Sequence, residues 1–79
     1  MTNTLTNACG LMEGIEWIGS NKWGESFTLR FAQKLIDDID QEFPNLDTWN
    51  CQNAIDANNV NESIAQLNNL YDQLAELAY

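Results

Sequence analysis

The sequence contains no histidine and only three basic residues, Lys22, Arg30 and Lys34. Without histidine, a Ser-His or Cys-His catalytic arrangement is impossible. Neither Cys9 nor Cys51 has a basic neighbour in the sequence, so neither is expected to be an activated thiolate. A structural zinc site would need more cysteine or histidine than the chain has. The sequence therefore predicts a protein that is not an enzyme and has no catalytic residue, metal or cofactor.

Other absences narrow the class further. The chain has no glycine-rich phosphate-binding loop, and its acidic run from Asp38 departs from the calcium-loop pattern at Phe43 and Trp49, where that loop needs Gly and Glu. No apolar run approaches the ~20 residues of a membrane helix, and the N-terminal segment lacks the features of a signal peptide. We therefore expect a cytoplasmic protein that binds no membrane. Cys9 and Cys51 could form a disulfide, but in a reducing cytoplasm we expect two free, buried thiols.

What the chain has in excess is acid, and the acid is unevenly distributed. The formal net charge is −9, from 12 acidic and three basic residues. Residues 1–34 carry all three bases and three acids, so the whole net charge belongs to residues 35–79. The negative electrostatic field of this half repels phosphates, which argues against direct nucleic-acid binding. It favours a partner with a basic protein surface, unless the acidic residues serve only solubility. The nine acids of this half are Asp37, Asp38, Asp40, Glu42, Asp47, Asp56, Glu62, Asp72 and Glu76.

The spacing of the apolar residues predicts an all-α fold. Apolar side chains recur every three or four positions, and 79 residues is the length of one small domain. We expect residues 1–79 to form a single acidic domain, a compact small bundle of about four helices over residues 4–18, 27–43, 45–57 and 60–78. An α+β alternative remains open, with a short hairpin around residues 16–29, because residues 19–25 are rich in turn formers.

The helix predicted over residues 27–43 has an unusual order of charges. Its two bases come early and its acids fill the last two turns, whereas the helix dipole favours the reverse. Asp37 and Asp40 lie on one side of its polar face, and Asp38 and Glu42 lie on the other. Nothing inside the protein needs these four acids, so they are the leading candidates for partner binding. The core face of this helix is expected to contain Phe31, Ala32, Leu35, Ile36, Ile39 and Phe43.

Local signals define the other helices. Pro44 is expected to end the second helix, Asn45 to cap the third, and Asn59 to begin the fourth in a capping-box pattern with Glu62. Gly10 and Gly14 stand four residues apart in the first helix. They either let a neighbouring helix approach closely or weaken the helix locally.

The tryptophans are the candidate apolar anchors. Trp49 is expected in the core, and Trp17 lies off the apolar face of its helix. Trp23 lies in the predicted loop and is either a plug over the core or an interface anchor. We therefore add Trp23 to the nine acids as an expected partner-binding residue.

Three classes of small acidic proteins were compared with these features. Acyl carrier proteins carry an Asp-Ser-Leu-type motif, which neither Ser26 nor Ser63 matches, and no motif of immunity proteins or antitoxins is present. In size, charge and lack of catalytic residues, the chain resembles phage and plasmid inhibitors that mimic DNA, such as some anti-CRISPR and anti-restriction proteins. This resemblance implies a non-enzymatic inhibitor, acting in the host cytoplasm if phage-encoded, that binds a basic, nucleic-acid-handling protein or complex.

A second hypothesis remains open beside it. The apolar stripe of residues 60–78 has a heptad-like spacing and would also suit a dimer seam. The chain would then be a monomer or homodimer that acts as a small helical assembly or immunity-type protein through an apolar helix face.

Overall fold

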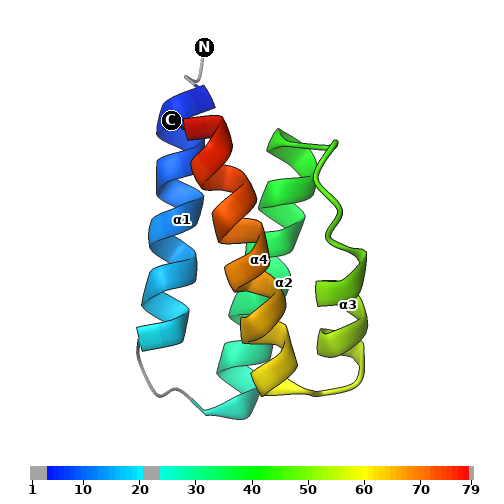
Figure 1. Cartoon of the computed structure of the whole chain (residues 1–79). Coiled ribbons are helices and arrows are strands. Elements are labelled where there is room, and N and C mark those ends of the chain that lie inside the picture. Colours follow the sequence, from blue (N-terminus) through cyan, green and yellow to red (C-terminus); the bar gives the residue numbers. More distant parts are fainter. Residues whose placement is uncertain (1–3, 21–23, 79) are drawn as a thin grey trace.

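The computed structural model describes residues 4–20 and 24–78, which form four α-helices and, within these ranges, no strand (Figure 1). The helices are α1 (Thr4–Ser20), α2 (Glu25–Glu42), α3 (Trp49–Asp56) and α4 (Val60–Ala78). The predicted all-α bundle is thus confirmed. The hairpin alternative is wrong, because residues 16–20 continue α1 and residues 25–29 already belong to α2.

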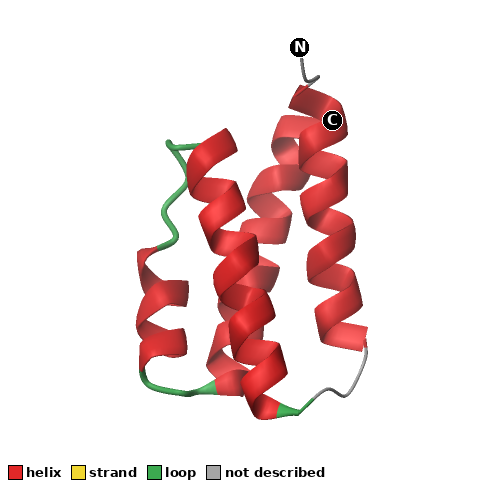
Figure 2. Ribbon diagram, turned by 180° about the vertical axis from the view of Figure 1, so that it is seen from behind, coloured by secondary structure: helices red, strands yellow, loops and turns green. Residues whose placement is uncertain are grey.

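Three long helices form the body of the bundle, and α3 lies beside it. In Figure 1 successive helices run in opposite directions, so that the beginning of α1 and the end of α4 lie at the same end of the molecule. The short α3 packs on α2 and α4 and, within the described residues, makes no contact with α1. Figure 2 shows α3 at the outer edge, joined to α2 by a loop that runs along the side of the bundle.

The core lies where α1, α2 and α4 meet. Most of their predicted apolar positions are buried, but Phe31 of α2 is only half-buried. In the apolar stripe of α4, Leu67, Leu70 and Leu74 are each 2% exposed or less and Leu77 is 50% exposed. The other described members of that stripe are half-buried: Val60, Ile64, Tyr71 and Ala75. The short α3 adds Cys51 and Ala54 to the interior. The buried apolar residues of α1 and α2 include Ala8, Leu11, Met12, Ile15, Ile18, Ala32, Leu35, Ile36 and Ile39, and Phe43, which follows α2, is also buried.

Two of the predicted helix boundaries are confirmed. The backbone N–H of Phe43 donates to the carbonyl of Ile39 at 2.7 Å, and α2 ends there, before Pro44. At the start of α4 the Asn59 side chain accepts a hydrogen bond from the backbone N–H of Glu62 at 3.1 Å, as expected for an N-cap.

The third helix begins later than predicted. It starts at Trp49 and not at Asn45, because residues 43–48 form a turn, a bend and an irregular connection. The N-cap residue is Thr48, whose side chain makes no capping hydrogen bond. Oδ1 of Asp47, one residue earlier, accepts a hydrogen bond from the backbone N–H of Trp49 at 2.9 Å. The helix is followed by a tight turn in which Asn58 has a φ of 56°, a left-handed conformation that asparagine tolerates better than most residues.

Both cysteines are free thiols, as expected, but Cys9 is half-exposed and not buried as predicted. Cys51 is buried under α4, where its Sγ lies 3.7 Å from the carbonyl oxygen of Ser63. Burial disfavours the charged thiolate and raises the pKa of Cys51 to about 11. Across the described part of the chain, no helix has the length and apolarity required to cross a membrane.

Candidate functional site

Trp49 is the most exposed of the large apolar residues in the described structure, with 67% of its surface accessible. The prediction that it lies in the core is wrong. The inward side of α3 is set by Cys51 and Ala54, which are buried. Trp49 precedes Cys51 by two residues, or about 200° of helical rotation, and therefore points to the opposite side.

Trp49 lines a hollow of about 440 Å³ together with Asp40, Asp47 and Gln52, among others. Two of its carboxylates are held in place by neighbours. The buried Thr48 hydroxyl donates to Oδ1 of Asp40 at 2.6 Å, and the Trp49 backbone N–H donates to Oδ1 of Asp47 at 2.9 Å. The hollow therefore combines an aromatic surface with two oriented anionic groups.

A hydrogen-bonded row of side chains extends this site across α2 and α3. Gln33 on α2 and Gln52 on α3 donate to each other at 2.8 and 2.7 Å. Gln33 also donates to Oδ1 of Asp37 at 3.0 Å, and Gln52 also donates to Oδ1 of Asp56 at 2.9 Å. The row places Asp37 and Asp56 on the side of the molecule that carries Trp49.

We refer to Asp37, Asp40, Asp47, Trp49, Gln52 and Asp56 as the Trp49 face. Each of its four carboxylates accepts a hydrogen bond through Oδ1, and each donor is an uncharged amide or hydroxyl group. Within residues 4–20 and 24–78, the ion pair that forms is Lys34–Asp38, at 3.3 Å, which lies outside this face. The four negative charges of the Trp49 face are therefore ordered but not neutralised by a described cation.

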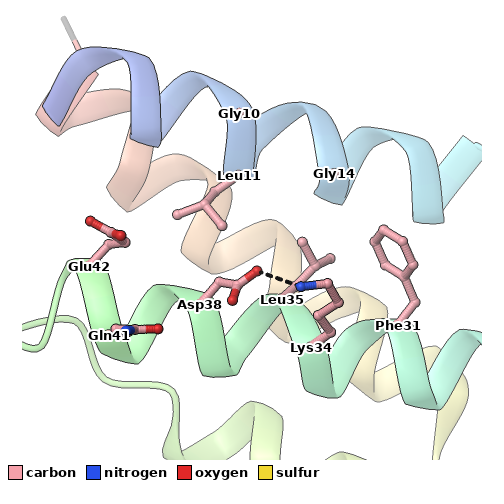
Figure 3. A pocket seen from close by; sticks show the side chains of 9 residues that line it. All are labelled: Gly10, Leu11, Gly14, Phe31, Lys34, Leu35, Asp38, Gln41 and Glu42. Carbon is pink, nitrogen blue, oxygen red and sulfur yellow. Dashed lines mark hydrogen bonds and ion pairs between the residues drawn. The ribbon is translucent and has the colours of Figure 1, made fainter. Parts of the chain in front are cut away.

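The other two leading acids lie on the opposite side of α2. Asp38 and Glu42 line a groove of about 400 Å³ between α1 and α2, together with Lys34 (Figure 3). The predicted division of the four acids between two sides of α2 is therefore confirmed. In this groove a Cβ on Gly14 would lie 2.7 Å from Cδ2 of Leu35, whereas a Cβ on Gly10 would meet nothing within 4 Å. The close approach of a neighbouring helix is thus found at Gly14.

The remaining candidates are dispersed. Glu62, Asp72 and Glu76 are exposed on α4, where Glu62 accepts a hydrogen bond from Gln66 at 2.8 Å. Trp23 lies outside the described residues. The nine acids thus form a wide field, of which Asp40 and Asp47 line the hollow with Trp49, while Asp37 and Asp56 are linked to that side through Gln33 and Gln52.

The bases of α2 lie beside a separate aromatic cluster. The ring of Trp17 lies 6.2 Å from that of Phe27 and 4.9 Å from that of Phe31. Arg30 and Lys34 line a hollow of about 290 Å³ with Phe27 and Phe31. The positive charges of α2 are therefore gathered next to these rings, where Trp17 and Phe27 are each 39% exposed.

Sequence reasoning missed the Trp49 hollow although one signal for it was present. Asp47 stands two residues before Trp49, and an Asp at that distance from a helix start is a common capping arrangement. A helix that starts there excludes Leu46, so Cys51 and Ala54 set its inward side. Trp49, about 200° from Cys51, then faces outward. The Gln33–Gln52 pair joins residues 19 positions apart, and no local pattern predicts it.

Among the residues that the structure describes, no group of three or more His, Cys, Asp or Glu side chains is arranged to hold a metal ion. Comparisons with protein-family models, with curated proteins and with solved structures find no match to this chain.

Proposed function

We propose that the protein is a non-enzymatic inhibitor that binds a basic, nucleic-acid-handling protein or complex through its acidic surface, in the manner of a DNA mimic. The observation that carries this proposal is the state of the nine acids of residues 35–79. All nine are exposed or half-exposed, and the four carboxylates of the Trp49 face accept hydrogen bonds from uncharged donors, so a described cation does not neutralise them. These four charges are therefore available to a partner.

The physical basis is the resemblance between this surface and the charge of a duplex. Duplex DNA carries about one negative charge per 1.7 Å of helix axis, and proteins that bind it line their channels with Lys and Arg. A small helical bundle with carboxylates held by its own hydrogen bonds offers such a channel ordered negative charges. Complementary charge also speeds association, which favours an inhibitor that must compete with DNA.

The proposal is tested by capture from an extract of the native host on the immobilised protein at low and high salt, followed by identification of the bound proteins. We expect a basic nucleic-acid-binding protein that is released by added salt and by an excess of duplex DNA. Release by DNA is the decisive result, because a DNA mimic and DNA occupy the same site. A partner that stays bound in the presence of both would contradict the proposal.

A matched pair of variants tests the role of the acids. The first combines Asp37→Asn, Asp40→Asn and Asp56→Asn, three acids of the Trp49 face that accept hydrogen bonds from uncharged donors. The control combines Glu13→Gln, Glu16→Gln and Glu25→Gln, which removes the same charge from the formally neutral part of the chain. We expect the first variant to lose at least about tenfold in affinity while keeping its helix content, and the control to lose much less.

The second hypothesis, a helical assembly acting through an apolar helix face, remains a prediction. The residues of the α4 stripe that it invokes, Leu67, Leu70 and Leu74, are buried within the chain and are already used by its own core. Sedimentation separates the two hypotheses. A tight dimer whose affinity for its partner does not change with salt concentration would support the assembly, because binding between opposite charges weakens as salt is added.

A further inference from the structure

We infer that the Trp49 face binds an arginine side chain of the partner protein, with the guanidinium stacked on the exposed indole of Trp49 and hydrogen-bonded to Asp40 and Asp47. The inference rests on the proposed function for the nature of the partner, and it specifies where the contact is centred and which side chain is recognised.

The first feature that supports this binding mode is the placement of the Trp49 indole. Trp49 exposes 67% of its surface, and its hollow is lined by the polar residues Asp40, Asn45, Asp47, Thr48 and Gln52 and by the apolar residues Pro44 and Leu46. Trp49 is thus turned away from the core by the phase of α3, while Cys51 and Ala54 take the inward positions. Tryptophan at the centre of a contact surface is among the residues that contribute most to binding energy.

The second feature is the negative charge of the hollow, which determines the charge of the group that can bind in it. Asp40 and Asp47 line the same hollow as the indole, and each has its Oδ1 atom fixed by a neutral donor within the chain. Ionised carboxylates accept hydrogen bonds and donate none. The complementary occupant is therefore a cation that donates several hydrogen bonds, and an acidic peptide or a phosphate backbone would be repelled.

The third feature is the combination of an indole with two carboxylates, which distinguishes arginine from lysine. A guanidinium is planar, carries five N–H donors and is weakly hydrated, so it can lie on an aromatic ring and bind carboxylates with its edge at the same time. The ammonium of lysine is a compact, strongly hydrated charge. It cannot lie flat on the indole and bind both carboxylates at the same time. A site that combines an indole with two carboxylates in one hollow therefore favours arginine.

A second copy of the chain would be a poor occupant. Its exposed Arg30 lies beside the Trp17–Phe27–Phe31 cluster, and each copy carries a net charge of −9, which opposes self-association. Sedimentation at low salt should therefore show a monomer. A dimer that disappears in an Arg30→Gln variant would identify a second copy as the occupant and overturn the inference.

The experiment uses two synthetic peptides of equal charge, acetyl-(Gly-Arg)4-amide and acetyl-(Gly-Lys)4-amide, titrated into the whole ¹⁵N-labelled protein at low salt. The indole N–H resonance of Trp49 is assigned by its loss in Trp49→Phe. We expect the arginine peptide to shift this resonance and the backbone amides of residues 47–52, and to bind more tightly than the lysine peptide. The Trp49→Ala substitution should weaken binding of the arginine peptide about two- to fivefold, which is the effect of an exposed cation–π contact.

The variants form a graded series with a control elsewhere on the surface. Trp49→Phe keeps an aromatic ring and should bind between wild type and Trp49→Leu, which keeps apolar bulk without a ring. Leu77→Ala removes another exposed apolar side chain, on α4, and should leave peptide binding unchanged. Circular dichroism of each variant establishes that the helices are intact.

Two results would overturn the inference: equal binding of the two peptides, or binding of the arginine peptide that is the same in wild type, Trp49→Leu and Trp49→Ala. Neither result bears on the proposed function, which depends on release of the captured host protein by duplex DNA. Conversely, the site could prove specific for arginine and dependent on Trp49 while duplex DNA fails to release the captured host protein. That result would support the inference and refute DNA mimicry.

Discussion

Gln33 on α2 and Gln52 on α3 donate a hydrogen bond to each other across the two helices, at 2.8 and 2.7 Å, and each donates a second one to an aspartate four residues further along its own helix. The pair has two effects. It ties the outer helix to the bundle, and it orients Asp37 and Asp56 without neutralising them.

Removal of one partner of this pair should destabilise the protein. Gln52→Ala leaves the half-buried amide of Gln33 without its cross-helix partner, and we expect the free energy of unfolding to fall by about 1–2 kcal/mol. Urea denaturation measures the change. Gln41→Ala, at an exposed position of α2, is the control and should stay within about 0.5 kcal/mol of wild type. If the Gln33→Ala and Gln52→Ala effects simply add in the double variant, the two side chains are not coupled.

The two glycines of α1 should respond differently to alanine. Gly10→Ala adds a methyl group into open space and should stabilise the protein by about 0.5–1 kcal/mol, because alanine loses less backbone entropy in a helix. At Gly14 the new Cβ would lie 2.7 Å from Cδ2 of the buried Leu35, so that side chain must move and the gain is reduced or reversed. Thermal melts of the two variants test the difference. Equal stabilisation would show that α1 and α2 are not in close contact at Gly14.

Truncation of the α4 stripe should be severe at one position and mild at another. Leu67 is fully buried between helices, and Leu67→Ala should cost about 2–5 kcal/mol through lost burial and the cavity it leaves. In a domain of 79 residues this is a large part of the total stability. Leu77→Ala, at a half-exposed position of the same helix, should change the urea midpoint little. A comparable loss at both positions would mean that Leu77 is buried in solution, as in a dimer.

The pH dependence above neutrality should report the burial of Cys51. Its folded-state pKa is raised from 9.0 to about 11, so the thiolate forms more easily in the unfolded chain. The corresponding stability is fully present below pH 9 and is lost as the pH rises from 9 through 11. A Cys51→Ala variant in the same buffers should show a smaller fall in the free energy of unfolding, because the other titrating groups remain. Iodoacetamide at pH 8 should modify the half-exposed Cys9 first, and faster labelling of Cys51 would contradict its burial.

The acids of α4 should cost stability in the isolated protein. Asp72 and Glu76 are like charges four residues apart, and Glu76 also lies in the last turn, where the helix dipole disfavours a negative charge. Glu76→Gln should raise the free energy of unfolding by about 0.3–1 kcal/mol at low salt, and the gain should shrink in 1 M salt. Urea denaturation at the two salt concentrations checks this. A decrease on substitution would mean that Glu76 makes a favourable contact within the fold.

Much of the fold follows from apolar periodicity. The long helices α2 and α4 have wide apolar stripes, and their core residues, such as Ile36 and Leu67, are buried where the spacing places them. The short α3 has too few positions to define a stripe. With Leu46 outside the helix, Cys51 and Ala54 set its inward side, so Trp49, about 200° from Cys51, faces outward and not into the core.

The candidate site was predicted in part. The sequence indicates which residues carry charge, and the helical geometry of α2 correctly separates Asp37 and Asp40 from Asp38 and Glu42. It does not show that Asp47 and Asp56 join the first pair, because that grouping depends on how α3 docks against α2. Long-range hydrogen bonds such as Gln33–Gln52 arise from this docking and leave no periodic trace in the chain.

The position of α3 outside the three-helix body has a consequence for how this protein can change. Its outward residues, Trp49, Asn50, Asn53 and Asp56, are exposed, while Cys51, Ala54, the half-buried Ile55 and the Gln33–Gln52 pair hold its inner side in place. Sequence variation at the outward positions should therefore alter what the protein recognises without disturbing the interior of α1, α2 and α4. Such a separation lets selection, or a combinatorial library, retarget the molecule while its fold stays constant.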